Sequence, residues 1–168
     1  MSTQSKALIK YSDMDDAAQQ MAVDCCAAAF ERFSLDQDVA KYVKNEFDRR
    51  FGGVWHCVVG TNFGSIVVPE ILRVCTKSAM SGKRTRELIQ SDMSEDMQEF
   101  VINACDEAFQ LFQMEKDVAN YLKHKMREHY LGCWHCIVGE KFGSSVTYEP
   151  NTFINLYFDR YGILLFKT

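Results

Sequence analysis

The sequence has few helix breakers and no long hydrophobic segment. Only two prolines and nine glycines occur among 168 residues, and 47% of the residues are hydrophobic against 25% charged. This balance is typical of a globular protein and excludes collagen, a coiled coil and a disordered chain. No apolar run reaches the roughly 18–20 residues that would span a bilayer. The first six residues also lack the basic start and apolar core of a secretory signal.

The sequence also has no excess of positively charged residues. Nineteen Lys and Arg residues face 23 Asp and Glu residues, which gives a net charge of −4 and a pI of about 5.6. We therefore expect no nucleic acid and no membrane among the partners. The cysteines number seven, and an odd count argues against a disulfide framework. Together these features predict a soluble intracellular protein.

Three short motifs occur twice in the chain. The Ser-Asp-Met, Trp-His-Cys and Phe-Gly-Ser motifs at residues 12–14, 55–57 and 63–65 each recur 79 residues later. Aligned without a gap, residues 12–65 and 91–144 are identical at 22 of 54 positions. A single register shared by three motifs indicates a tandem of two related repeats.

Each repeat has the pattern of two helices followed by strands. Apolar residues three and four apart occur along residues 18–33 and 39–47, and at the equivalent positions of the second repeat. Ser12-Asp13 and Ser91-Asp92 are expected to begin the first helix of each repeat, and glycines 52, 53 and 132 to end the second. The aromatics of these stripes (Phe30, Phe33, Phe109, Phe112) are expected in the core, together with the cysteines Cys25, Cys26 and Cys105.

The pattern then changes to that of strands. Residues 54–59 are β-branched and aromatic, and a turn at residues 60–62 is expected before the next strand at residues 63–68. The second repeat adds an opening strand at 86–89 and a closing hairpin at 153–158 and 162–167. This order predicts an α+β fold in which two helices pack on an antiparallel sheet.

The first repeat lacks a match to the closing hairpin. Residues 71–75 are apolar and could replace one of its strands, or could belong to a linker. We expect a first, incomplete unit at residues 1–70, a linker at 71–84 and a second, complete unit at 85–168.

The ordered set of motifs across both repeats resembles the dynein light chains of the light-chain-eight type. The usual form of that family has one repeat, so a fused pair with a shortened first copy is a departure. The resemblance is carried by these segments of the second repeat: 91–94, 115–117, 134–139, 142–144 and 163–167.

This resemblance implies a non-catalytic hub without a cofactor. In the family, two units pair so that a strand of each crosses into the sheet of the other, and a short extended peptide adds to the crossed strand. The expected partners are the dynein intermediate chain and other light chains, on a microtubule motor in the cytoplasm or in the axoneme of a cilium or flagellum. An adaptor for non-motor partners remains an alternative.

The resemblance also implies the residues that bind peptide. In the second repeat they are a crossed edge strand, a lysine at the start of a helix and a groove floor: Phe142, Gly143, Ser144, Ser145, Val146, Thr147 and Tyr148; Lys116; Phe153, Tyr157 and Leu164. In the first repeat the edge strand comprises Asn62, Phe63, Gly64, Ser65, Ile66, Val67 and Val68. There Gln37 replaces the lysine, and Pro69 removes one backbone donor from the edge.

Two assemblies follow from the shortened first repeat. If the repeats pair within one chain, as an internal pseudo-dimer, one intact groove built on residues 62–68 is expected. If the second repeat pairs with that of another chain, a homodimer results. His56 and His135 are expected at the pairing interface as structural histidines, or as groups that make pairing pH-sensitive.

Cys133 and Cys136 form a CxxC motif, which leaves a thiol-redox protein as a third and weaker alternative. A redox CxxC lies at the start of a helix, whereas these residues lie in an expected strand. No second CxxC or paired histidines complete a set of four metal ligands, so no metal site is expected.

Overall fold

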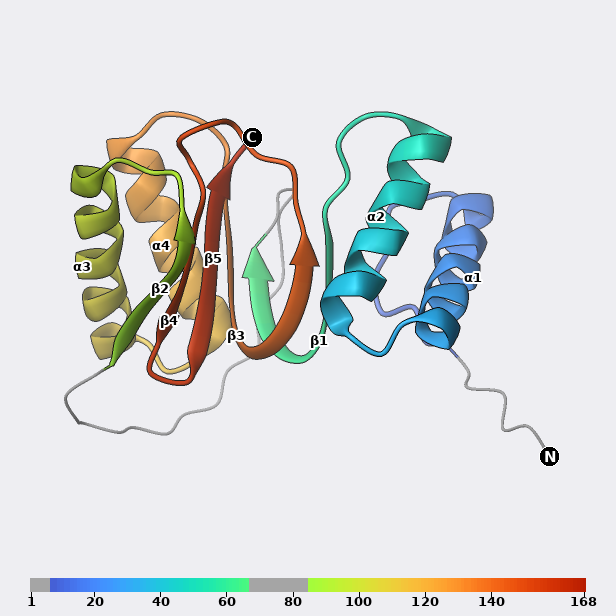
Figure 1. The fold of residues 1–168 in the computed structure, drawn as a ribbon, viewed down its shortest axis with the longest axis horizontal. Coiled ribbons are helices and arrows are strands. Elements are labelled where there is room, and N and C mark those ends of the chain that lie inside the picture. Colours follow the sequence, from blue (N-terminus) through green and yellow to red (C-terminus); the bar gives the residue numbers. More distant parts are fainter. Residues whose placement is uncertain (1–6, 67–84) are drawn as a thin grey trace. The chain divides into compact units, whose positions relative to one another are not determined.

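The computed structural model describes residues 7–66 and 85–168 (Figure 1). The expected α+β class is confirmed. In chain order the elements are α1 (Asp16–Arg32), α2 (Asp36–Phe51), β1 (Cys57–Ile66), β2 (Arg86–Ser91), α3 (Glu95–Leu111), α4 (Glu115–His129), β3 (Trp134–Ser145), β4 (Ile154–Phe158) and β5 (Tyr161–Lys167). None of the helices in these ranges has the length and apolar character needed to cross a membrane.

The first helix of each repeat begins a little later than the sequence predicts. Asp15 caps α1, and Ser94 caps α3, by accepting backbone N–H groups at 2.7 Å and 3.4 Å. Asp92 instead accepts from the backbone N–H groups of Asn151 and Phe153, so it fixes the turn that precedes β4. The Ser-Asp motif of the second repeat therefore ties a loop to the sheet.

The described residues form two compact units that exchange a segment. The first unit is Met1–Val59 together with Gly143–Val146, and the second is Gly60–Phe142 together with Thr147–Thr168. Each unit therefore contains the two helices of one repeat and a short piece of strand from the other repeat. This is the crossed-over strand that the family resemblance implies.

The second unit contains an antiparallel sheet with the strand order β1-β3-β5-β4-β2. β3 pairs with β5 from Trp134↔Lys167 to Gly139↔Gly162, and β4 joins β5 to β2. In this unit residues 60–66 of β1 are the strand beside β3, at the end of the sheet.

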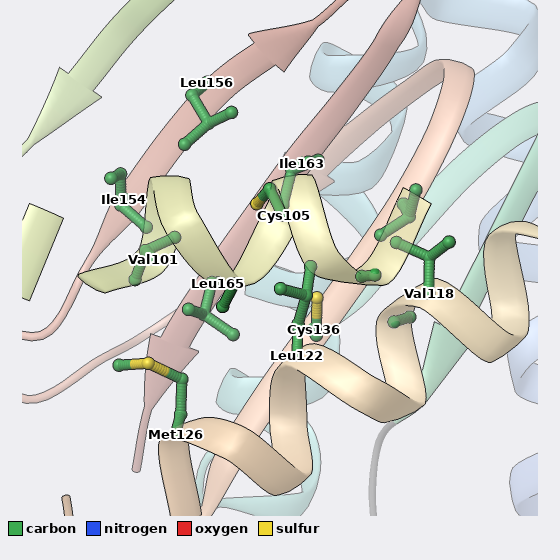
Figure 2. Packing of buried hydrophobic residues seen from close by; sticks show 14 of the residues in the cluster. Val101, Cys105, Val118, Leu122, Met126, Cys136, Ile154, Leu156, Ile163 and Leu165 are labelled. Atoms are coloured by element: carbon green, nitrogen blue, oxygen red, sulfur yellow. The ribbon is translucent and has the colours of Figure 1, made fainter. Parts of the chain in front are cut away.

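The core of the second unit lies between the sheet and its two helices (Figure 2). Alternate residues of each strand face α3 and α4, because successive side chains of a strand point to opposite faces. Burial of each large apolar side chain contributes about 1.5–3 kcal/mol. The buried set includes Val101, Cys105, Val118, Leu122, Met126, Cys136, Ile154, Leu156, Ile163 and Leu165.

Among the described residues, the core of the first unit is much smaller. Its buried residues are Ala29, Val39, Val43 and Phe47, with partly buried neighbours around them. The expectation that Phe30 and Phe33 are core residues is wrong, since they are 59% and 36% exposed. In the second unit, the equivalent Phe109 stacks on Phe158 and Tyr161 at 5.0 Å and 5.3 Å. No strand in the described part of the first unit replaces β4 and β5, so Phe30 has no such partners.

The expected turn at residues 60–62 is also wrong, because β1 and β3 each continue without interruption. Gly60 and Gly139 lie where the backbones of the two strands approach each other closely. A Cβ atom on Gly60 would lie 2.7 Å from Phe142 Cα, and one on Gly139 would lie 2.6 Å from Phe63 Cα. Glycine at these positions allows strand pairing rather than chain reversal.

Two further glycines lie against the first turn of a helix. In the second unit, a Cβ atom on Gly64 would lie 2.5 Å from the backbone nitrogen of Lys116 in α4. In the first unit, a Cβ atom on Gly143 would lie even closer to the backbone nitrogen of Gln37 at the start of α2. A strand from one repeat therefore packs backbone to backbone against a helix of the other.

We expect Gly64→Ala to destabilise the chain by roughly 1–3 kcal/mol, because the new methyl group overlaps backbone atoms that move only with α4. Urea unfolding followed by circular dichroism measures the change. Gly162→Ala is the matched control in a strand, since its Cβ would meet its nearest neighbour at 3.4 Å. Equal free energies of unfolding for the two variants would contradict the placement of β1 against α4.

Candidate functional site

The outer edge of β1 is the first feature of the candidate site. In the second unit, residues 60–66 have β3 on one side, and no described strand pairs on the other. Asn62 is exposed, and the half-buried Phe63 packs its ring 6.2 Å from that of Phe142. Ser65 and Ile66 complete β1, whereas Val67, Val68 and Pro69 lie outside the described residues. An unpaired edge of this kind is able to accept another strand.

The start of α4 lies directly beside this edge. Met114, the N-cap residue, provides no side-chain hydrogen bond to the first turn of the helix. The first N–H groups of a helix have no partner within the helix, and they carry a partial positive charge. The half-buried Lys116 belongs to this turn, and its backbone nitrogen is the atom that Gly64 approaches. The structure therefore brings the free edge of β1, a helix N-terminus and a lysine together within one compact unit.

The three residues expected in the groove floor have different environments. Leu164 is 2% exposed and lies opposite Ile137 and Asn155 in the ladders of β3 and β4. Tyr157 is 42% exposed, and its place in β4 puts it on the face of the sheet away from α3 and α4. Phe153 is buried and stacks on Tyr148, with ring centroids 4.5 Å apart.

Sequence analysis missed Asn155 as a residue of this face. It is half-buried and lies directly opposite Leu164 in the pair of β4 and β5. Alternation along β4 places it on the same face as Tyr157, two residues later. That alternation, read from the sequence, was sufficient to find it.

The second edge expected to bind peptide, residues 142–148 at the end of β3, has different neighbours from the β1 edge. Phe142, Gly143, Ser144 and Ser145 belong to β3, whereas Val146, Thr147 and Tyr148 follow the strand. Gly143 contacts the start of α2, where the exposed Gln37 occupies the position of Lys116. The described part of the first unit has no strands equivalent to β4 and β5, so this edge lacks the floor that the second unit provides.

The two interface histidines differ in burial. His135 is 4% exposed, its Nε2 lies 2.8 Å from the Thr168 hydroxyl oxygen, and its ring stacks on Phe166. His56 is only half-buried and precedes β1. Burial lowers the pKa of His56, with Lys44 adding to this effect and Asp48 opposing it. Protonation of His56 is therefore less favourable in the folded state than in the unfolded chain.

The two cysteines of the CxxC motif differ in their exposure to solvent. Cys133 is exposed, whereas Cys136 is fully buried. Burial, together with the neighbouring Cys105, raises the pKa of the Cys136 thiol well above its ordinary value. A thiol in this state is a poor nucleophile, because the thiolate is the reactive form. Among the described residues, no three His, Cys, Asp or Glu side chains are placed to hold a metal ion.

We expect the free energy of unfolding to fall as the pH drops through the range just below the ordinary pKa of histidine, about 6.5. In this range the unfolded chain binds more protons at His56 than the folded chain does, because the folded pKa is lowered. Urea unfolding between about pH 7.5 and 5.5 should show a shallower decline for His56→Gln than for the wild type. His124→Gln, which alters an exposed histidine of α4, is the control. Superimposable profiles for His56→Gln and the wild type would contradict the assignment.

Comparison with known protein families agrees with this geometry. The family described as dynein light chain type 1 matches the chain twice, at residues 6–74 and 85–168, which confirms the tandem of two units. Its members are associated with dynein and are generally structural or adaptor proteins that bind dynein components and dimerise. The chain belongs to the dynein light chain type 1 family.

Proposed function

We propose that this protein is a non-catalytic light chain of a dynein motor complex that binds short extended peptides by strand addition to the outer edge of β1. The observation that supports this function is the free edge of residues 60–66 beside the first turn of α4. The intermediate chain of dynein is the proposed partner, in the cytoplasm or in an axoneme.

Strand addition explains how such an edge gains both affinity and selectivity. Backbone hydrogen bonds between the peptide and β1 supply affinity that depends little on peptide sequence. Alternate side chains of the peptide then meet the protein on one face, where Lys116 and the helix N-terminus favour a polar or acidic group. Tyr157, Asn155 and Leu164 would form the floor below.

The proposed division is a first unit at residues 1–70, a linker at 71–84 and a second unit at 85–168. Pairing of the two repeats within one chain is supported by the exchanged segments, residues 60–66 and Gly143–Val146. Only the β1 edge has a complete sheet behind it, so one peptide per chain is proposed. In solution the protein would have the mass of one chain, 19.3 kDa.

Isothermal titration with a peptide from the dynein intermediate chain tests this function. We expect a stoichiometry of one peptide per chain, and about tenfold weaker binding for Lys116→Gln, because the charge-assisted contact is lost. Gln37→Lys is the matched control at the equivalent position of the first repeat, and it should leave the affinity unchanged. Light scattering on the same samples should give the mass of a single chain.

Three outcomes would contradict the proposal. Absence of peptide binding would refute the partner, and an unchanged affinity for Lys116→Gln would refute the position of the site. Two peptides per chain would show that the edge at residues 142–148 also binds.

A further inference from the structure

One buried lysine of the second repeat lacks the carboxylate that its counterpart in the first repeat has. Lys123 in α4 is 8% exposed, and Arg127 lies one helical turn later. The equivalent residues of the first repeat, 79 positions earlier, are Lys44 and Asp48. The first repeat therefore has an acidic residue where the second has a basic one.

In the first unit the charge of the buried Lys44 is balanced locally. Its ammonium group donates to the Asp48 carboxylate in an i,i+4 ion pair. The other oxygen of Asp48 accepts from the backbone N–H of Trp55 at 3.1 Å. The hydrogen bond from Lys44, followed by that from Trp55, lowers the pKa of Asp48, so the carboxylate stays ionised.

In the second unit, the positions equivalent to this ion pair hold two cations, Lys123 and Arg127. Within residues 7–66 and 85–168, neither Lys123 nor Arg127 forms an ion pair or a side-chain hydrogen bond. The dipole of α4 favours a cation in its last turn, which accounts for the exposed Arg127. Lys123 buries its aliphatic stem, while its ammonium group remains accessible to solvent and has no counter-ion among the described residues.

A cavity lies beside these two side chains. It has a volume of about 270 Å³ and is lined by Lys123, Arg127, Gly132, Cys133 and Trp134, all of the second unit. Gly132, which has a φ of +125°, leaves room for the aliphatic part of Lys167. The ammonium group of Lys167 already pairs with Glu149 at 2.7 Å. The unmatched positive charge at the cavity is therefore that of Lys123 and Arg127.

We propose that this cavity binds a phosphate group, either as the free ion or as a phosphate monoester. Two cations match the double negative charge of a phosphate better than the single charge of a carboxylate. The guanidinium of Arg127 can donate two parallel hydrogen bonds to phosphate oxygens, while Lys123 acts as a point charge. The site lies on residues other than those of the β1 edge, so it does not depend on the proposed peptide binding.

Nuclear magnetic resonance of the full chain tests this site at constant pH and ionic strength. Titration with inorganic phosphate, and separately with phenyl phosphate, should produce saturable shifts of the Gly132 and Cys133 amides and of the Trp134 indole. Tighter binding of phenyl phosphate would assign the site to a monoester, and tighter binding of the free ion would assign it to phosphate itself. Acetate should bind at least tenfold more weakly than either.

Arg127→Asp recreates the lysine–aspartate pair of the first repeat, and it should weaken phosphate binding at least tenfold. Arg127→Gln provides a neutral second variant, which should weaken binding in the same direction. Lys41→Asp makes the same change of charge at an exposed position of α2 and should bind as the wild type does. Shifts that fail to saturate below about 20 mM phosphate, or equal affinities for the wild type and both Arg127 variants, would overturn the proposal.

Discussion

Close backbone approach at two glycines is the contact on which the arrangement of this protein depends. Gly64 lies against the start of α4, and Gly143 against the start of α2, each in a unit whose helices come from the other repeat. No side chain fits between these backbones, so the crossed strands lie directly on the helix N-termini. The same contact places the free edge of β1 beside Lys116. The approach of Gly64 to α4 therefore determines both how β1 packs and where the candidate binding site lies.

The glycine contact occurs in both units, but only the second unit has a complete sheet beside it. In the second unit, β4 and β5 complete the sheet and cover the aromatic residues of α3, as the stack of Phe109 on Phe158 shows. The first unit has the same helices, but its smaller core leaves Phe30 exposed. Stability and binding are thus expected to concentrate in the second unit, with the first unit acting mainly as the donor of β1.

Much of the fold follows from the sequence, because the second repeat is complete and strongly periodic. Its helices, its closing hairpin and the family membership were all predicted from motifs in one register. The errors arise where a residue's role depends on a distant part of the chain. Gly60 has the composition of a turn, but it allows two strands to approach, and Phe30 has the periodicity of a core residue without the strands to cover it. The difference in charge beside Lys123 is visible in the sequence, since aligning the repeats sets Arg127 against Asp48, whereas the cavity itself is not.

Fusion of the two repeats has a genetic consequence. In a symmetric homodimer every substitution appears twice, so neither copy of a surface can change alone. Here the positions of Gln37 and Lys116, or of Asp48 and Arg127, are encoded separately, and each can mutate without altering its twin. Covalent linkage therefore allows one repeat to acquire a substitution while the other retains its own residue.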